Sequence, residues 1–178
     1  MAKAISTYRA VQAVSPGKLE LTEKPLRDPP AGHVRIRIEA CGVCHSDSAT
    51  VEGVLPVEWP RVPGHEAVGR IDVIGEGVEG WAVGQRVGVG FLGGSCGHCQ
   101  YCRDGDLVNC ANQGYTGVQH DGGYAEVMIA KASGLVAVPN DLYQQLGLHK
   151  VLSPLRLRGL TALLNRMKRN ARELTEAA

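Results

Sequence analysis

The sequence has few aromatic residues, no long apolar run and almost no net charge. Only 4% of its residues are Phe, Trp or Tyr, and 19 Lys and Arg stand against 18 Asp and Glu. Because a helix needs about 18 or more consecutive apolar residues to cross a bilayer, we expect no membrane partner. The apolar core of a secretion signal is also missing from the N-terminal stretch MAKAISTYRAVQAV, so we expect a cytoplasmic protein.

Glycine and cysteine, by contrast, are plentiful. The 23 glycines are typical of short strands joined by tight turns. Six cysteines without a secretion signal indicate reduced thiols, which favours metal binding over disulfides. The length of 178 residues leaves room for one ordinary domain and an appendage.

Alternation of apolar and polar residues predicts that the chain is mainly β up to about residue 140. Between residues 33 and 40 every second side chain, from Val34 onward, is apolar, the pattern of a strand with one buried face. Similar short runs lie at 18–21, 67–74, 86–89, 123–130 and 135–138. Glycine or proline clusters separate them and no long helix intervenes, so we expect a small, partly open β-barrel.

The chain changes in charge and in pattern near residue 150. Residues 150–178 contain seven basic and two acidic side chains, whereas the preceding part is net acidic. Apolar residues recur there at helical spacing, at Leu160, Leu164, Met167, Ala171 and Leu174. We therefore expect a helical extension over residues 142–178. This helix could be a solvated remnant, it could fold back on the barrel, or it could pair with a second copy in a homo-oligomer. Its basic face lacks interleaved aromatic residues, so we expect no nucleic-acid partner.

Four cysteines lie close together in a C-x2-C-x2-C-x7-C array. They are Cys96, Cys99, Cys102 and Cys110. Four thiolates can surround Zn²⁺ and leave no position open for water, so the array predicts a structural zinc site, with unliganded thiols as the plain alternative. An iron–sulfur ligand run of the ferredoxin type continues with x3-C-P, whereas Ala111 follows the last cysteine here. We expect His98, inside the loop, to be exposed and unliganded.

A second group of metal-binding residue types follows the clearest predicted strand. The stretch Cys44-His45-Ser46-Asp47 comes directly after it, and Gly64-His65-Glu66 comes about twenty residues later. A cysteine, a histidine and a carboxylate suit a catalytic zinc, which keeps one position open for substrate. Either the thiol or the imidazole could instead be a satisfied buried side chain. The pair His65-Glu66 is not a zincin motif, because no histidine follows at the required spacing.

A longer pattern surrounds His65, namely Gly64-His65-Glu66-x-x-Gly69-x5-Gly75-x-x-Val78. Residues 41–47 and 83–87, the four-cysteine loop and residues 121–126 stand around it in a fixed order. Together these motifs resemble the zinc-containing alcohol dehydrogenases of the medium-chain dehydrogenase/reductase family. The resemblance covers residues 1–141 and implies a GroES-like catalytic domain there.

The resemblance also implies a set of zinc ligands. Cys44 and His65 would bind the catalytic zinc, and Glu66 would be a carboxylate able to enter its coordination shell. Asp47 would orient His65 through a hydrogen bond.

Further roles follow from the same resemblance. Ser46 would pass the alcohol proton outward, and His45 would contact the pyrophosphate of the coenzyme. Cys41, outside the ligand pattern, would be a packed thiol. The residues implied for the substrate-pocket wall are Leu55, Trp59 and Phe91.

Three features depart from the family pattern. The Rossmann coenzyme domain should follow the catalytic domain, and we expect it to be absent from this chain. Residues 88–93 do fit G-x-G-x-x-G, but they lead into the cysteine loop rather than a helix, so we discard them as a coenzyme motif. Leu157 stands where the family has its third zinc-ligating cysteine, and Ala49 replaces a histidine that some members use to relay a proton.

The sequence therefore predicts the zinc-binding catalytic domain of an alcohol dehydrogenase-type oxidoreductase, inactive on its own. In the full-length family such a domain assists hydride transfer between a small alcohol or aldehyde and NAD(P). The alternatives are a non-enzymatic zinc module that binds a partner or dimerises, and a truncated relic. We expect the structural zinc to bind tightly and the catalytic zinc more weakly.

Overall fold

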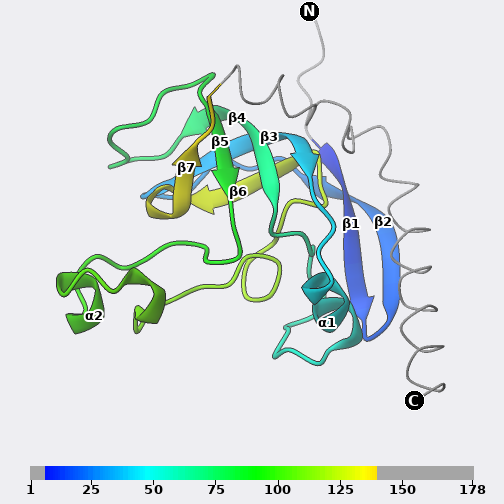
Figure 1. Ribbon diagram of the computed structural model, residues 1–178. Coiled ribbons are helices and arrows are strands. Elements are labelled where there is room, and N and C mark those ends of the chain that lie inside the picture. The colour runs from blue at the N-terminus through cyan, green and yellow to red at the C-terminus, as the bar shows by residue number, and fades with distance from the viewer. Residues whose placement is uncertain (1–6, 140–178) are drawn as a thin grey trace, which may run out of the picture.

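Two antiparallel sheets form the part of the protein that the structure, a computed structural model, describes, which is residues 7–139 (Figure 1). The smaller sheet is a hairpin of β1 (Thr7–Ser15) and β2 (Lys18–Pro25). The larger sheet contains β3 (His33–Cys41), β4 (Ala67–Ile74), β5 (Arg86–Val89), β6 (Val127–Lys131) and β7 (Leu135–Ala137). The helices are short: α1 (Ser46–Glu52), α2 (Gln100–Arg103) and the 3-10 turns η1 (Leu107–Asn109) and η2 (Ala132–Gly134).

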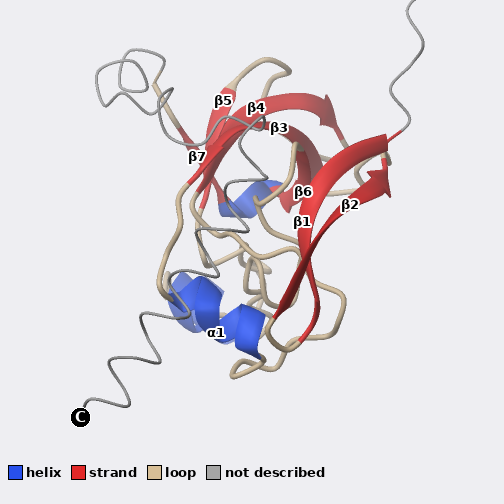
Figure 2. Ribbon diagram, turned by 90° about the vertical axis from the view of Figure 1, so that its right-hand side faces the viewer, coloured by secondary structure: helices blue, strands red, loops and turns tan. Residues whose placement is uncertain are grey.

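The larger sheet has the strand order β6-β3-β4-β5-β7 and curls around the core (Figure 2). Strand β3 pairs with both β4 and β6, so that Val34 lies opposite Ile74 on one side and Ala130 on the other. The apolar residues of β3 face inward, and Val34 and Ile36 are fully buried. The core therefore fills the concave side of one curled sheet, as period-two patterning dictates.

The β1–β2 hairpin closes one side of this core (Figure 2). The backbone N–H of Val11 donates to the carbonyl of Tyr124 at 2.8 Å. The Arg9 guanidinium, through Nε and Nη2, contacts one carboxylate oxygen of Glu126, while the Arg9 backbone N–H donates to the other oxygen at 2.9 Å. These contacts attach the hairpin to the segment that leads into β6.

The expected fold class, a mainly β, partly open barrel with a cysteine loop, is confirmed. Strand β1 was not among the predicted strands. Its residues Ala10, Val11, Gln12 and Ala13 are all buried, so the run shows no alternation to detect. The predicted strand 123–130 begins only at Val127, because Gly122 and Gly123 instead donate to the carbonyls of Val62 and Gly64 at 2.7 and 2.8 Å.

Two further sequence expectations concern the C-terminal extension and the membrane. The helical extension over 142–178, together with Leu157, lies outside the described residues. Among the residues that are described, none of the helices has the length and apolar character needed to cross a membrane.

Candidate metal sites

The loop after β3 brings two distant segments together. The backbone N–H of Gly42 donates to the carbonyl of Glu66 at 3.0 Å, which extends the pairing of β3 and β4 toward the start of α1. A Cβ atom on Gly42 would lie 2.1 Å from a carboxylate oxygen of Glu66. Only glycine at this position lets the Glu66 carboxylate approach the loop that carries Cys44.

The carboxylate of Asp47 organises this loop from the first turn of α1. Its Oδ2 accepts the backbone N–H of Cys44 at 2.9 Å and the hydroxyl of Tyr124, and its Oδ1 accepts the N–H of Gly64 at 3.2 Å. Oδ1 also lies 3.0 Å from Nδ1 of His65. Asp47 is 1% exposed, so the charge is buried but fully supplied with donors.

His65 consequently presents its other ring nitrogen to the opposite side. Nε2 lies 3.1 Å from the hydroxyl oxygen of Ser46, which in turn lies 3.1 Å from Sγ of Cys44. The ligand atoms of Cys44, His65 and Glu66 all lie within 4.8 Å of one another. A histidine that donates Nδ1–H to a carboxylate and offers Nε2 is the usual arrangement of a metal ligand, so these residues fit a zinc ion.

The protonation of this cluster follows from its hydrogen bonds. The Asp47 carboxylate raises the pKa of His65 to about 9, against burial, which acts to lower it. The Ser46 hydroxyl, and then the His65 ring, lower the pKa of the Cys44 thiol. Without a metal, the cluster therefore favours a protonated His65 ring, next to a thiol whose ionisation is eased. A metal ion bound there has to displace the proton from His65.

The four-cysteine loop forms a second cluster, around α2 and η1. Sγ of Cys96 lies 4.0 Å from Sγ of Cys102, and the sulfurs of Cys99 and Cys110 are also 4.0 Å apart. A zinc ion with four Zn–S bonds of about 2.3 Å requires sulfurs about 3.8 Å apart in a tetrahedron, so the loop has the size of a zinc site. The backbone N–H of Cys96 donates to the Cys110 sulfur at 3.3 Å, a contact that stabilises a thiolate.

The loop also gives its thiols different pKa values. The Asn112 side chain and nearby backbone N–H groups lower the pKa of Cys96 to about 5. Burial and the neighbouring Cys99 raise the pKa of Cys102 to about 11. Four sulfurs packed this closely cannot all ionise without a cation between them, which again fits a metal site.

The remaining predicted residues take different places. Phe91 meets the His65 ring edge-on, with centroids 5.1 Å apart, and stacks on Tyr115. His98 is exposed, as expected, and its Nδ1 lies 2.8 Å from the carbonyl of Cys96. Cys41 is a packed thiol, as expected, 5% exposed, and burial raises its pKa to about 12.

Three more candidates lie on or near α1. His45 is exposed at the start of the helix, and its side chain does not cap it. Trp59 is partly buried against Gly53, where a Cβ atom would lie 3.2 Å from the indole. Leu55 is also partly buried.

Sequence reasoning missed Tyr124 and Gly42. Tyr124 lies inside the motif 121–126, but nothing in that motif shows that its hydroxyl reaches a residue 77 positions earlier. Gly42 stands between two predicted features, Cys41 and Cys44, without a pattern of its own. The roles of Tyr124 and Gly42 become visible only in the folded structure, where one segment of the chain approaches another.

Known proteins match both the sequence and the fold. Residues 30–140 match the family model described as the alcohol dehydrogenase GroES-like domain. Over 113 residues the chain is 46% identical to an alcohol dehydrogenase from Geobacillus stearothermophilus, a match that covers 62% of this chain and 34% of that protein. The chain spans about 35% of the length of the curated relatives it matches.

Solved structures give the same correspondence. A short chain alcohol dehydrogenase (rspB) from Escherichia coli CFT073, complexed with NADH, superposes with a TM-score of 0.72 and 36% identity over 80% of this chain and 42% of that one. A cobalt- and zinc-bound thermostable alcohol dehydrogenase from Pyrobaculum aerophilum superposes with a TM-score of 0.71 and 34% identity, covering 76% and 43% of the two chains.

Proposed function

Because this chain belongs to the alcohol dehydrogenase GroES-like domain family, we propose that it supplies the zinc-binding catalytic domain of an alcohol dehydrogenase-type oxidoreductase. The observation that carries the proposal is the convergence of Cys44, His65 and Glu66 on one point, with Asp47 behind the imidazole. The substrate would be a small alcohol or aldehyde, and the hydride acceptor NAD or NADP.

Each residue of the cluster would have its own role. Cys44 and His65 would hold a zinc ion, with Glu66 as a further carboxylate within reach. When bound there, zinc would supply Lewis acidity toward an alcohol oxygen and ease the loss of its proton. Asp47 keeps the His65 ring oriented, because its carboxylate is itself fixed by three donors besides the imidazole.

Ser46 is the proposed proton carrier. Its hydroxyl lies 3.1 Å from both Cys44 Sγ and His65 Nε2, so it lies among the groups that would bind the metal. A hydroxyl can accept a proton while donating its own, and it could pass the alcohol proton toward His45, which is exposed next to it. Phe91 would form part of the substrate-pocket wall, because its ring meets His65 edge-on.

The four-cysteine loop would hold a second zinc with a structural role. Cys96, Cys99, Cys102 and Cys110 offer four sulfurs, which leaves no ligand position for substrate. The ion would order a loop whose only helices, α2 and η1, have four and three residues.

The coenzyme would need a nucleotide-binding unit outside residues 7–139. Residues 7–139 contain no βαβ unit of the kind that binds dinucleotides, and their larger sheet is entirely antiparallel. His45 would contribute a contact to the pyrophosphate from the catalytic side. We propose that the 178-residue chain, without such a unit beside it, oxidises alcohol with NAD barely or not at all.

Cobalt substitution tests the proposed site directly. In the Co²⁺-loaded chain, a small alcohol or its aldehyde should change the visible spectrum, because a catalytic-type site keeps a position open for substrate. The Cys44→Ser variant should lose this response, whereas Cys41→Ser, which changes a thiol outside the ligand group, should keep it. A spectrum that no alcohol or aldehyde alters would contradict the proposal and favour a non-enzymatic zinc module.

A further inference from the structure

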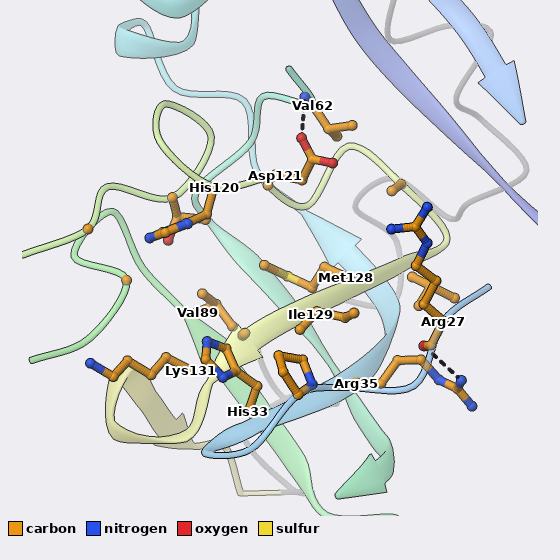
Figure 3. A pocket seen from close by; sticks show the side chains of 18 of the residues that line it. Arg27, His33, Arg35, Val62, Val89, His120, Asp121, Met128, Ile129 and Lys131 are labelled. Atoms are coloured by element: carbon orange, nitrogen blue, oxygen red, sulfur yellow. Dashed lines mark hydrogen bonds between the residues drawn. The ribbon is translucent and has the colours of Figure 1, made fainter. Parts of the chain in front are cut away.

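A cavity of about 540 Å³ lies alongside β6 (Figure 3). None of the seven candidate zinc ligands lines it. Its walls come from β6, from the chain between β2 and β3, and from residues 112–122, which are far apart in the sequence. The volume lies within the range of about 300–1,000 Å³ that is usual for small-molecule sites.

One wall of the cavity is apolar. Val62, Val89, Ala125 and Met128 all line it, and each of them is at most 5% exposed. Figure 3 shows Met128, Ile129 and Val89 among the side chains that line the cavity. Ile129 also lines the cavity but is only partly buried, so a ligand that covered it would need an apolar body.

The charged side chains around the cavity are almost all basic. Five Lys or Arg residues and two histidines line it, against one carboxylate, that of Asp121. Asp121 is already engaged, since it lies 2.6 Å from Nζ of Lys24 and accepts the backbone N–H of Val62 at 3.0 Å. Its charge therefore does not neutralise the rest of the cavity.

The basic residues that lack a counter-charge lie at both ends of the cavity. Arg35 is paired with Asp72 at 2.9 Å, but neither Arg27 nor Lys131 has an ion pair within residues 7–139. Lys131 lies opposite His33 in the β6–β3 register, and His120 faces the same end from across the cavity (Figure 3).

A further donor in the wall has no acceptor. Nε of Arg61 is buried and finds no hydrogen-bond partner among the described residues, although Nη1 lies 3.4 Å from Asp121. Burial lowers the pKa of His120, and its electrostatic interactions with Arg61, His33 and Lys131 lower it further, so these side chains lie close to one another. Lys131 and Arg27 thus add positive charge to this space that its one carboxylate, Asp121, does not pair with.

We propose that this cavity binds a small organic anion, with its apolar part over Ile129 and its anionic group beside Lys131, His33 and His120. The partly buried Ile129 selects against a bare inorganic ion, which would leave its side chain uncovered. The basic end selects against a neutral molecule, which would leave the charges unpaired. None of the proposed zinc ligands lines this site, although Asn112 in its wall also contacts Cys96.

Phenyl phosphate is a suitable probe because it combines an aromatic body with a phosphate. Titrated into the zinc-loaded full chain by calorimetry, it should bind saturably and at least tenfold more tightly than inorganic phosphate or benzyl alcohol. The Lys131→Gln variant should weaken binding about tenfold. Lys18→Gln, which removes an exposed lysine at the start of β2, should leave it unchanged.

Amide chemical-shift mapping distinguishes this cavity from the metal site. Shifts should appear on β6 and on residues 93–94 and 112–114, and circular dichroism should show that both variants are folded. Equal affinity for the Lys131 and Lys18 variants, no saturable binding, or shifts confined to Ser46 and His65 would each overturn the proposal.

Discussion

The hydroxyl of Tyr124 donates a hydrogen bond to Oδ2 of Asp47, across 77 positions of sequence. Both residues are 1% exposed. The other oxygen of the same carboxylate lies 3.0 Å from Nδ1 of His65. Tyr124 therefore positions the group that positions a proposed zinc ligand, although it is not itself one of the ligands.

The first prediction concerns this hydroxyl. Tyr124→Phe removes one oxygen and leaves the ring, so the packing should persist while Asp47 loses a donor. We expect zinc affinity at the Cys44 site to fall about tenfold, because loss of a contact behind a metal ligand costs about 10–100-fold. Chelator competition measures this affinity. The control is Tyr115→Phe, which removes the hydroxyl of a partly buried tyrosine that stacks on Phe91. Equal zinc affinities for the two variants would contradict the role assigned to Tyr124.

The second prediction concerns the glycine before His65. Gly64 has φ +97, and a Cβ atom there would lie 2.6 Å from a ring carbon of Tyr124. Gly64→Ala should therefore destabilise the fold by about 2–4 kcal/mol, since it adds a clash to backbone strain. Gly80→Ala is matched, because Gly80 has φ +77 but open space around it. In urea unfolding, the Gly80 variant should lose only about 1 kcal/mol of its free energy of unfolding, the cost of backbone strain alone. Similar losses for the two variants would count against the clash.

The third prediction is a pH dependence. His65, with a pKa raised to about 9 by Asp47, must lose a proton when zinc binds at Nε2. Zinc affinity at this site should therefore rise with pH up to about 9, roughly tenfold per pH unit for each proton that zinc displaces. Calorimetry in buffers of different ionisation enthalpy counts the protons released. An affinity that stays constant between pH 7 and 9 would be incompatible with this account.

The same pKa shift has the opposite effect on the metal-free fold. A histidine whose pKa is raised by folding stabilises the folded state fully below its unfolded value of 6.5. That contribution is lost as the pH rises toward about 9. Metal-free protein should thus unfold more easily at pH 9 than at pH 6.5, and the Asp47→Asn variant should show less of this dependence.

The fourth prediction concerns the contact between the hairpin and the sheet. Burial acts to raise the pKa of Glu126, but the hydrogen bonds from Arg9 outweigh it and lower the pKa. Glu126→Gln should cost about 1–2 kcal/mol at neutral pH, and this difference should shrink as acid protonates the wild-type carboxyl. Glu20→Gln, which breaks the exposed pair with Lys18, should cost less than about 1 kcal/mol. Equal losses in urea unfolding at pH 7 would refute the distinction.

Local patterns made much of the fold predictable. The four cysteines of the loop lie between residues 96 and 110, so their spacing alone restricts them to one small volume. The alternation in β3 likewise gave its buried face, because one side of that strand meets the core and the other does not.

Long-range contacts were not predictable in the same way. The four consecutive buried residues of β1 conceal its period, because side chains on both of its faces are buried there. Cys44 and His65 could be assigned to one site only through the resemblance to a family. The contact of Tyr124 with Asp47 and the basic end of the β6 cavity depend on how distant segments meet, which no spacing in the sequence encodes.

The central claim is that Cys44, His65 and Glu66 form a zinc site in addition to the cysteine loop. Elemental analysis of the folded full chain, dialysed against a weak chelator in the presence of zinc, tests it most directly. The account predicts two zinc ions per chain, with the second released first as the chelator is raised, and one in the Cys44→Ser variant. One zinc per chain in both proteins would contradict it, because only the cysteine loop would then hold metal.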